Sequence, residues 1–169
     1  LLKSAGCRVV AMGVEVADDE LRRSVLNKPV DTAQIVAAAR AVKAAGIYLV
    51  TFKILGLPWG ALADDVETLA LNQRLRSDHT RVSILVPFPK SALTQRLMES
   101  GVLCRDFHER IYEVDDLPHW PAESLFQRQN VAETMRLFRL WYLLLRLRLP
   151  AKWLRRLARS RLAQFLAPV

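Results

Sequence analysis

Cysteine is scarce in this sequence of 169 residues. Cys7 and Cys104 are the only two, and they lie far apart. Two distant cysteines exclude a disulfide framework, and they exclude a cysteine-rich metal site built by this chain alone. We therefore expect a reducing, cytoplasmic setting.

Long hydrophobic runs are missing as well. The first residues show no basic start that leads to an apolar stretch and a small-residue cleavage site. In the apolar region 131–149 the longest uncharged run is six residues, at 140–145. Such a run is too short for a transmembrane helix.

Acidic residues are nearly absent from residues 131–169. This segment holds nine basic residues and one acid, Glu133, which account for the whole formal net charge of +8. The remainder of the chain is neutral. Any interpretation that rests on charge is therefore confined to this tail.

The overall composition is that of an ordinary globular domain, with 51% hydrophobic and 25% charged residues.

A short segment of the sequence is repeated. The segment Leu-Lys-Ser-Ala-Gly-Cys at 2–7 recurs as Val-Lys-Ala-Ala-Gly-Ile at 42–47. Each copy is typical of a helix end, a Gly cap and the start of a strand. Because the chain starts with such a helix end, we expect it to begin partway through a fold.

Three short apolar runs bounded by turn residues predict buried strands at 8–15, 48–55 and 81–86. Between them we expect one helix that begins after Asp31 as N-cap and another over 62–75. This alternation predicts an α/β fold with a parallel sheet and right-handed crossovers. A short helix at 91–101, an irregular segment to 130, and helices from Val131 to the end, broken at Pro150, should follow.

Three parallel strands with helices on one side make a poor stand-alone domain. We therefore predict a partial (β/α) barrel over residues 1–101, followed by an irregular segment and a basic α-helical extension over 102–169. The expected partner is the missing N-terminal half of the barrel.

In such a fold the site lies at the C-terminal ends of the strands. The period of two places Gly13 and Glu15 on one face of the first strand, with Lys53 on the second strand and Ser83 on the third. This alternation predicts that Glu15, Lys53 and Ser83 converge on a cavity. The alternative is a buried ion pair between Glu15 and Lys53.

Two loops follow strands at this expected edge. They read Gly-Leu-Pro-Trp-Gly at 56–60 and Val-Pro-Phe-Pro at 86–89. The first is a tight turn where backbone can approach a ligand, and the second is stiffened by two prolines. Taken singly, either loop is more typical of a plain connection than of a binding site.

Several of these segments together carry a family likeness. They are Ala-Gly-Cys at 5–7 leading to Gly-Val-Glu at 13–15, Lys-Ala-Ala-Gly at 43–46, Leu-Gly-Leu-Pro at 55–58, and Val-Pro-Phe-Pro at 86–89 with Ala-Leu at 92–93. In order and spacing they resemble the second half of the radical S-adenosylmethionine barrel, over residues 1–98. The nearest likeness is to the branch that often carries an upstream cobalamin-binding domain, whose C-terminal extension the basic tail also resembles.

The resemblance implies S-adenosylmethionine and a [4Fe-4S] cluster as cofactors of the full-length parent, with cobalamin as a further cofactor in that branch. Glu15 matches a family position near the methionine and ribose parts of S-adenosylmethionine, where Gly13 allows close approach. The turn after the fifth barrel strand is matched by Gly56, Leu57 and Pro58. The end of the sixth strand, near the adenine, is matched by Val86, Pro87 and Phe88.

The chain also departs from the family's pattern. Val16 replaces a usual Ser, Trp-Gly-Ala at 59–61 replaces Gly-Glu-Thr, and Lys53 stands where an apolar residue is common. The Cys-x-x-x-Cys-x-x-Cys loop that binds the cluster is absent. Cys7 and Cys104 cannot replace it, because a cluster needs three thiolates close together. We therefore expect no cleavage of S-adenosylmethionine by this chain alone.

The basic tail allows several interpretations. The favoured one is a set of helices that pack on the barrel and expose an arginine-rich face to solvent. The alternative is a basic amphipathic helix that binds a membrane surface or a protein partner, which would make the protein peripheral to the membrane. Nucleic-acid binding is disfavoured because no base-reading motif accompanies the charge.

Overall fold

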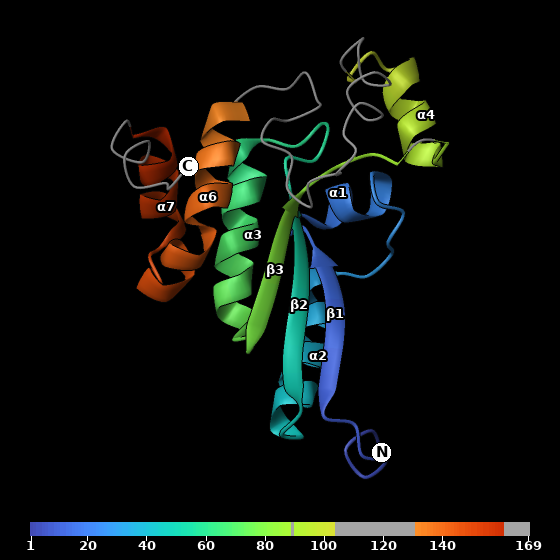
Figure 1. The fold of residues 1–169 in the computed structure, drawn as a ribbon, viewed down its shortest axis with the longest axis vertical. Helices are drawn as coiled ribbons and strands as arrows, with labels where there is room; N and C mark the ends of the chain where they lie inside the picture. Colours follow the sequence, from blue (N-terminus) through green and yellow to red (C-terminus); the bar gives the residue numbers. More distant parts are fainter. Residues whose placement is uncertain (89, 104–130, 161–169) are drawn as a thin grey trace, which may run out of the picture.

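The core of the protein is a parallel sheet of three strands in the order β1-β2-β3 (Figure 1). The computed structural model describes residues 1–88, 90–103 and 131–160. The strands are β1 (Val9–Glu15), β2 (Tyr48–Leu55) and β3 (His79–Ile84). The prediction of an α/β fold with a three-stranded parallel sheet is therefore confirmed. β3 begins before the predicted residue 81, because His79 and Thr80 already pair with β2.

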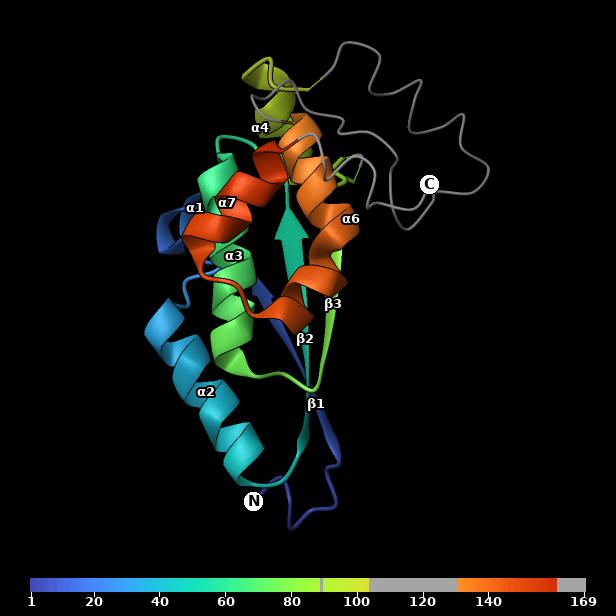
Figure 2. The same cartoon turned by 90° about the vertical axis from the view of Figure 1, so that its left-hand side faces the viewer.

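Six helices are described around this sheet: α1 (Asp19–Ser24), α2 (Thr32–Ala44), α3 (Leu62–Leu75), α4 (Ala92–Glu99), α6 (Val131–Leu147) and α7 (Ala151–Arg159). Figure 2 shows α2, α3, α6 and α7 on one side of the sheet. The predicted start of α2 is confirmed, since the Asp31 side chain accepts from the Gln34 N–H and Gln34 accepts from the Asp31 N–H. The sequence did not predict α1.

Helices bury one face of the sheet, whereas the other face carries exposed side chains. On β2, Leu49, Thr51, Lys53 and Leu55 are buried beneath the helices, and we call this side the helix face. The opposite side, the bare face, carries Val9, Ala11 and Gly13 of β1, Tyr48, Val50, Phe52 and Ile54 of β2, and His79, Arg81 and Ser83 of β3. Tyr48 is 47% exposed and Phe52 is 38% exposed. Parallel sheets usually have both faces covered, so this open side is unusual.

The C-terminal helices complete the helix face. Leu137, Leu140, Trp141 and Leu144 of α6 and Leu154 of α7 form one buried cluster with residues of α3, β2 and β3. Each fully buried leucine contributes about 2 kcal/mol of hydrophobic stabilisation. The interpretation of the tail as helices that pack on the α/β body is therefore confirmed, and so is the break at Pro150, which is the N-cap of α7.

None of the helices in the described ranges is long and apolar enough to cross a bilayer. The predicted irregular segment lies almost wholly outside the described residues, as do Cys104, Pro89 and the predicted helix beyond residue 160.

Candidate functional site at the carboxyl ends of the strands

Glu15 ends β1 in an unusual backbone conformation. Its φ is 65°, and the pairing of β1 with β2 slips between Gly13 and Glu15. Few residues other than glycine adopt such a φ, and a bulge of this kind re-aims a side chain at a strand end. The carboxylate of Glu15 lies 3.0 Å from the ammonium of Lys28, which also donates a hydrogen bond to the Gly13 carbonyl at 2.7 Å.

Gly13 makes room for this ion pair. A Cβ at Gly13 would lie 2.3 Å from Glu15 Oε1 and 2.7 Å from Lys28 Nζ. The carboxylate and the ammonium therefore occupy the space on the bare face that a side chain at position 13 would need. No sequence pattern indicated Lys28, because it lies in the irregular connection after α1. That a cofactor approaches Gly13 stays a prediction.

Lys53 does not join Glu15 and Ser83, so the predicted convergence is wrong. Lys53 lies on the helix face, 1% exposed, whereas Ser83 lies on the bare face beside Ile54. The Lys53 ammonium donates hydrogen bonds to the hydroxyls of Thr51 and Thr80. The alternative of a Glu15–Lys53 ion pair is also wrong, since the Glu15 carboxylate pairs with Lys28. Both errors arise because the prediction took Lys53 to face a cavity, whereas the regular alternation of β2 places it on the helix face with Leu49 and Leu55.

Burial changes the protonation of Lys53. Loss of water around the ammonium lowers its pKa from 10.5 to about 7, and the negative charge of Glu15 opposes that lowering. The lysine is therefore partly neutral near pH 7. Ser83 donates a hydrogen bond to the Lys53 carbonyl at 3.4 Å, so it is linked to the backbone of this residue and not to its side chain.

The turn after β2 is anchored from within the protein. Gly56 has a φ of 73°, and its N–H donates to Asp65 Oδ1 of α3 at 3.0 Å. The other oxygen of Asp65 accepts from the Thr134 hydroxyl of α6 at 2.7 Å. Gly56 and Pro58 are buried, and Leu57 is 1% exposed. One buried carboxylate thus holds this turn to α6.

Trp59 follows in the same turn and is exposed. Its φ is 62°, at a position where the family's pattern has glycine, and half of its surface is open to solvent. The guanidinium of Arg96 in α4 lies 5.5 Å from the centre of the indole ring, within the range of a cation–π contact. Arg96 also donates to the Ser24 carbonyl at 2.7 Å, which links α4 to the end of α1.

The loop after β3 presents one exposed aromatic ring. Val86 is half-buried against Leu85 and Leu97, and Pro87 is buried. Phe88 is 70% exposed. Among the residues predicted for the site, Glu15 and Phe88 therefore offer the most accessible chemistry at this edge: a half-buried carboxylate and an open ring.

Arg22 fixes the segment that follows β1, and the sequence did not indicate it. The side chain is fully buried, and it donates hydrogen bonds to the carbonyls of Val14 at 3.2 Å and Val30 at 2.8 Å, and to that of Val16. It also pairs with Asp19 at 2.6 Å. The pKa of Asp19 is lowered, chiefly by a hydrogen bond from the Thr32 hydroxyl. Nothing in the sequence separates Arg22 from its exposed neighbour Arg23.

The residues of this site fit S-adenosylmethionine in part, but they do not fit a [4Fe-4S] cluster. Glu15 and Phe88 could supply a carboxylate and an aromatic surface to S-adenosylmethionine. A [4Fe-4S] cluster needs three thiolates close together. Cys7 is the one cysteine in the described ranges, and it lies before β1, at the opposite end of the strand. Within those ranges no three His, Cys, Asp or Glu side chains gather into a metal site.

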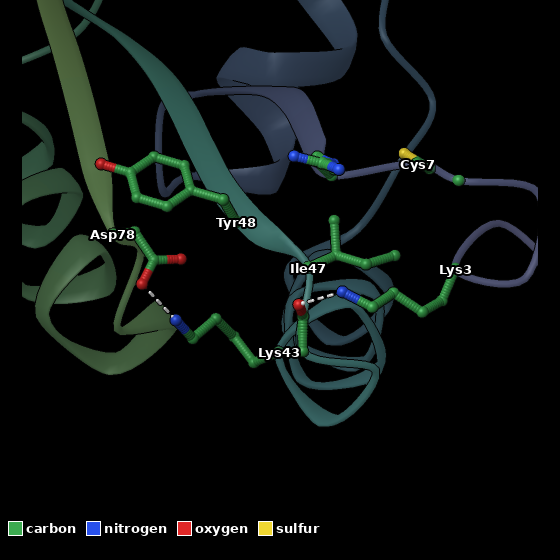
Figure 3. A pocket seen from close by; sticks show the side chains of 9 residues that line it. Lys3, Cys7, Lys43, Ile47, Tyr48 and Asp78 are labelled. Atoms are coloured by element: carbon green, nitrogen blue, oxygen red, sulfur yellow. Dashed lines mark hydrogen bonds and ion pairs between the residues drawn. The ribbon is translucent and has the colours of Figure 1, made fainter.

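A depression of about 740 Å³ lies at the other end of the strands (Figure 3). Among its charged groups, Lys43 pairs with Asp78, and Lys3 donates to the Gly46 carbonyl at 2.9 Å. The pKa of Asp78 is lowered, first by the hydrogen bond from the Leu49 N–H and then by Lys43. These contacts stabilise the amino ends of the strands, as is typical of that end of an α/β barrel.

No family model matches this sequence, and no curated protein matches it.

Proposed function

We propose that this chain forms the second half of the barrel of a radical S-adenosylmethionine enzyme and contributes one wall of its cofactor pocket. The observation that carries the proposal is the bare face of the sheet. In a (β/α) barrel the helices lie outside and the inner faces of the strands are enclosed. A half-barrel would therefore show helices on one face of a parallel sheet and an open, partly apolar second face, as this protein does.

The edge of the sheet supports the same proposal. Within the described residues β1 pairs with β2 alone, so its outer edge is available to a further strand. Unpaired strand edges are usually shielded by charges or by other chain segments. The expected partner is the N-terminal half of the barrel, whose last strand would pair with β1.

The proposed cofactor wall lies at the carboxyl ends of the strands. There Glu15 would accept a hydrogen bond from the amino or ribose groups of S-adenosylmethionine, and Val86, Pro87 and Phe88 would border the adenine. Lys28 would have to share or release the Glu15 carboxylate. The [4Fe-4S] cluster, which supplies the electron for cleavage of S-adenosylmethionine, would be held by the partner half. Cobalamin remains a further candidate cofactor.

Co-expression with the polypeptide encoded immediately upstream tests the proposal. We expect that polypeptide to contain a Cys-x-x-x-Cys-x-x-Cys loop and to co-purify with this chain. After anaerobic reconstitution, the Glu15→Gln substitution should weaken binding of S-adenosylmethionine at least about tenfold. The matched control is Glu20→Gln, which changes an exposed carboxylate on α1. The proposal fails if the upstream sequence lacks the cysteine loop or if the two variants bind alike.

A second candidate function is attachment to an anionic membrane surface through α7. Trp153 is 49% exposed, the guanidinium of Arg156 lies 5.8 Å from its ring, and Lys152 and Arg159 are exposed beside it. An aromatic ring among cations is typical of interfacial helices. Co-sedimentation with anionic vesicles at low salt should be lost in Trp153→Ala. Absence of co-sedimentation by the unsubstituted chain would reject this candidate.

A further inference from the structure

A second hollow lies at the amino ends of the strands, on the helix face. It has a volume of about 340 Å³ and lies between the end of α3, the start of β3 and the end of α6. Its lining includes Arg76, Ser77, His79, Tyr142, Arg146 and Arg148. The volume is at the lower end of the range for small-molecule sites, about 300–1,000 Å³.

The walls of this hollow are fixed by hydrogen bonds between elements. The Gln73 amide of α3 donates to the Leu144 carbonyl of α6 at 3.4 Å. The Tyr142 hydroxyl of α6 donates to the Thr80 carbonyl of β3 at 3.3 Å. The three elements are thus tied together around the hollow, which makes it a preformed site.

The charge of the hollow is strongly positive. Arg76, Arg146 and Arg148 line it, and within the described part of the chain none of these guanidinium groups forms an ion pair with a carboxylate. Asp78 also lines it, but its carboxylate already pairs with Lys43 and accepts from the Leu49 N–H. Three arginines therefore line one small volume, and Asp78 is the one carboxylate among the described residues that line it.

Two of these arginines have a backbone conformation that favours glycine. Arg76 ends α3 with a φ of 51°, and Arg148 follows α6 with a φ of 48°. Glycine is the usual residue at such helix ends. A cation near a helix C-terminus is favourable because of the helix dipole, which accounts for one arginine at each end. The dipole does not account for three guanidinium groups around a shared hollow.

Polar groups extend from the hollow into the core. Ser77 donates to Asn72 Oδ1 at 3.2 Å, and the Thr51 hydroxyl donates to the same oxygen at 3.2 Å. The Lys53 ammonium in turn donates to Thr51. The wall of the hollow therefore offers hydroxyl groups as well as guanidinium groups, and a buried lysine lies behind it.

We infer that this hollow binds a small phosphorylated ligand, with its phosphate held by the guanidinium groups of Arg76, Arg146 and Arg148. Guanidinium groups suit phosphate oxygens because their paired N–H groups can donate in parallel. The ring of Tyr142 and the side chain of Leu145 border the remaining volume and would contact the organic part. The hollow lies at the opposite end of the strands from the proposed cofactor wall, so its test is independent of that proposal.

Calorimetric titration of the full chain with inorganic pyrophosphate tests the inference. We expect saturable binding with one site per chain, and a loss of affinity of at least about tenfold in Arg146→Gln and in Arg148→Gln. Arg139→Gln is the matched control, because Arg139 is an exposed arginine of α6 that does not line the hollow. Thermal melts of each variant confirm that it folds.

A competition experiment distinguishes binding of a free phosphorylated ligand from binding of a lipid headgroup. Vesicles that contain phosphatidic acid should not compete with pyrophosphate at equal phosphate concentration. No saturable binding of pyrophosphate at millimolar concentration would overturn the inference. So would an equal loss of affinity in Arg139→Gln, which would indicate attraction to general positive charge, or full competition by the vesicles.

Discussion

The helix face and the bare face of the sheet are built by the same three strands but have opposite surroundings. The helix face contacts α2, α3 and α6, with α7 packed on α3 and α6, and Trp141 of α6 is fully buried. The bare face leaves Val9, Tyr48 and Phe52 substantially exposed. Both faces carry many apolar residues, a composition typical of strands that are covered on both sides. The comparison indicates that this sequence suits an assembly with a second covering layer.

The bare face is covered at its carboxyl end. There Ile54 packs against Val16, Val25 and Leu57, and Leu93 of α4 lies in the same cluster. The contrast between the faces is therefore greatest toward the amino ends of the strands. Substitutions on the two sides should separate the contributions of these regions to stability.

The largest effect is expected at Arg22, which holds the segment that covers Ile54. Arg22→Met should lower the free energy of unfolding by about 3–5 kcal/mol, because it leaves several buried carbonyls without a donor and removes the cation that pairs with Asp19. Urea denaturation followed by circular dichroism measures the loss. Arg23→Met, at an exposed position, is the control and should change stability by less than about 0.5 kcal/mol. Similar losses in both variants would contradict the role given to Arg22.

Neighbouring residues of β2 compare the two faces directly. Leu49→Ala on the helix face should cost about 2–5 kcal/mol of unfolding free energy, because it opens a cavity among buried side chains. Phe52→Ala on the bare face removes a larger side chain but should cost about 1 kcal/mol or less. Equal losses in denaturant unfolding would mean that the bare face is covered in solution, and dilution of the sample would then reduce the loss at Phe52.

Substitution of Lys53 should change the stability in the opposite direction. Lys53→Met removes a buried ammonium and should raise the free energy of unfolding at pH 7 by about 1–4 kcal/mol. The unfolded chain binds this proton below pH 10.5, whereas the folded chain binds it only below about 7. The stability of the unsubstituted protein should therefore rise with pH between these values and fall as pH drops toward 7.

Unfolding measured from pH 7 to pH 10 checks this dependence. The stability advantage of Lys53→Met over the unsubstituted chain should shrink as pH rises. Lys90→Met, at an exposed lysine, is the control and should leave the pH dependence unchanged. A constant advantage across this range would contradict the lowered pKa of Lys53.

The sequence predicted the helices and strands better than it predicted the side of the sheet on which each strand residue lies. The span of β2, the span of α3 and the N-cap Asp31 were predicted correctly because each has a strong local signal: an apolar run bounded by turns, charges that suit the helix dipole, or a capping box. The helix α1 was missed, since its single turn and a half carries little apolar periodicity.

The candidate site was harder to predict because it depends on register. The slip between Gly13 and Glu15 brings Glu15 beside Lys53 in the pairing, while the side chains lie on different faces. A polar residue in a strand was assumed to face a cavity, yet Lys53 is buried among hydroxyl groups on the helix face. Arg22 lies in the short helix α1, and Lys28 lies in the irregular connection after it. In neither segment does a periodic pattern connect a side chain to a distant strand.

The position of α6 in the chain has a consequence for synthesis. Ile84 is the last strand residue of the buried cluster that α6 completes, and it leaves the ribosome about 60 residues before that helix ends at Leu147. At about 5–20 residues per second this interval lasts roughly 3–12 s. During that time the bare face and the part of the helix face that α6 will cover are open to other molecules in the cell. The nascent chain is therefore most vulnerable to aggregation just before its last helices emerge.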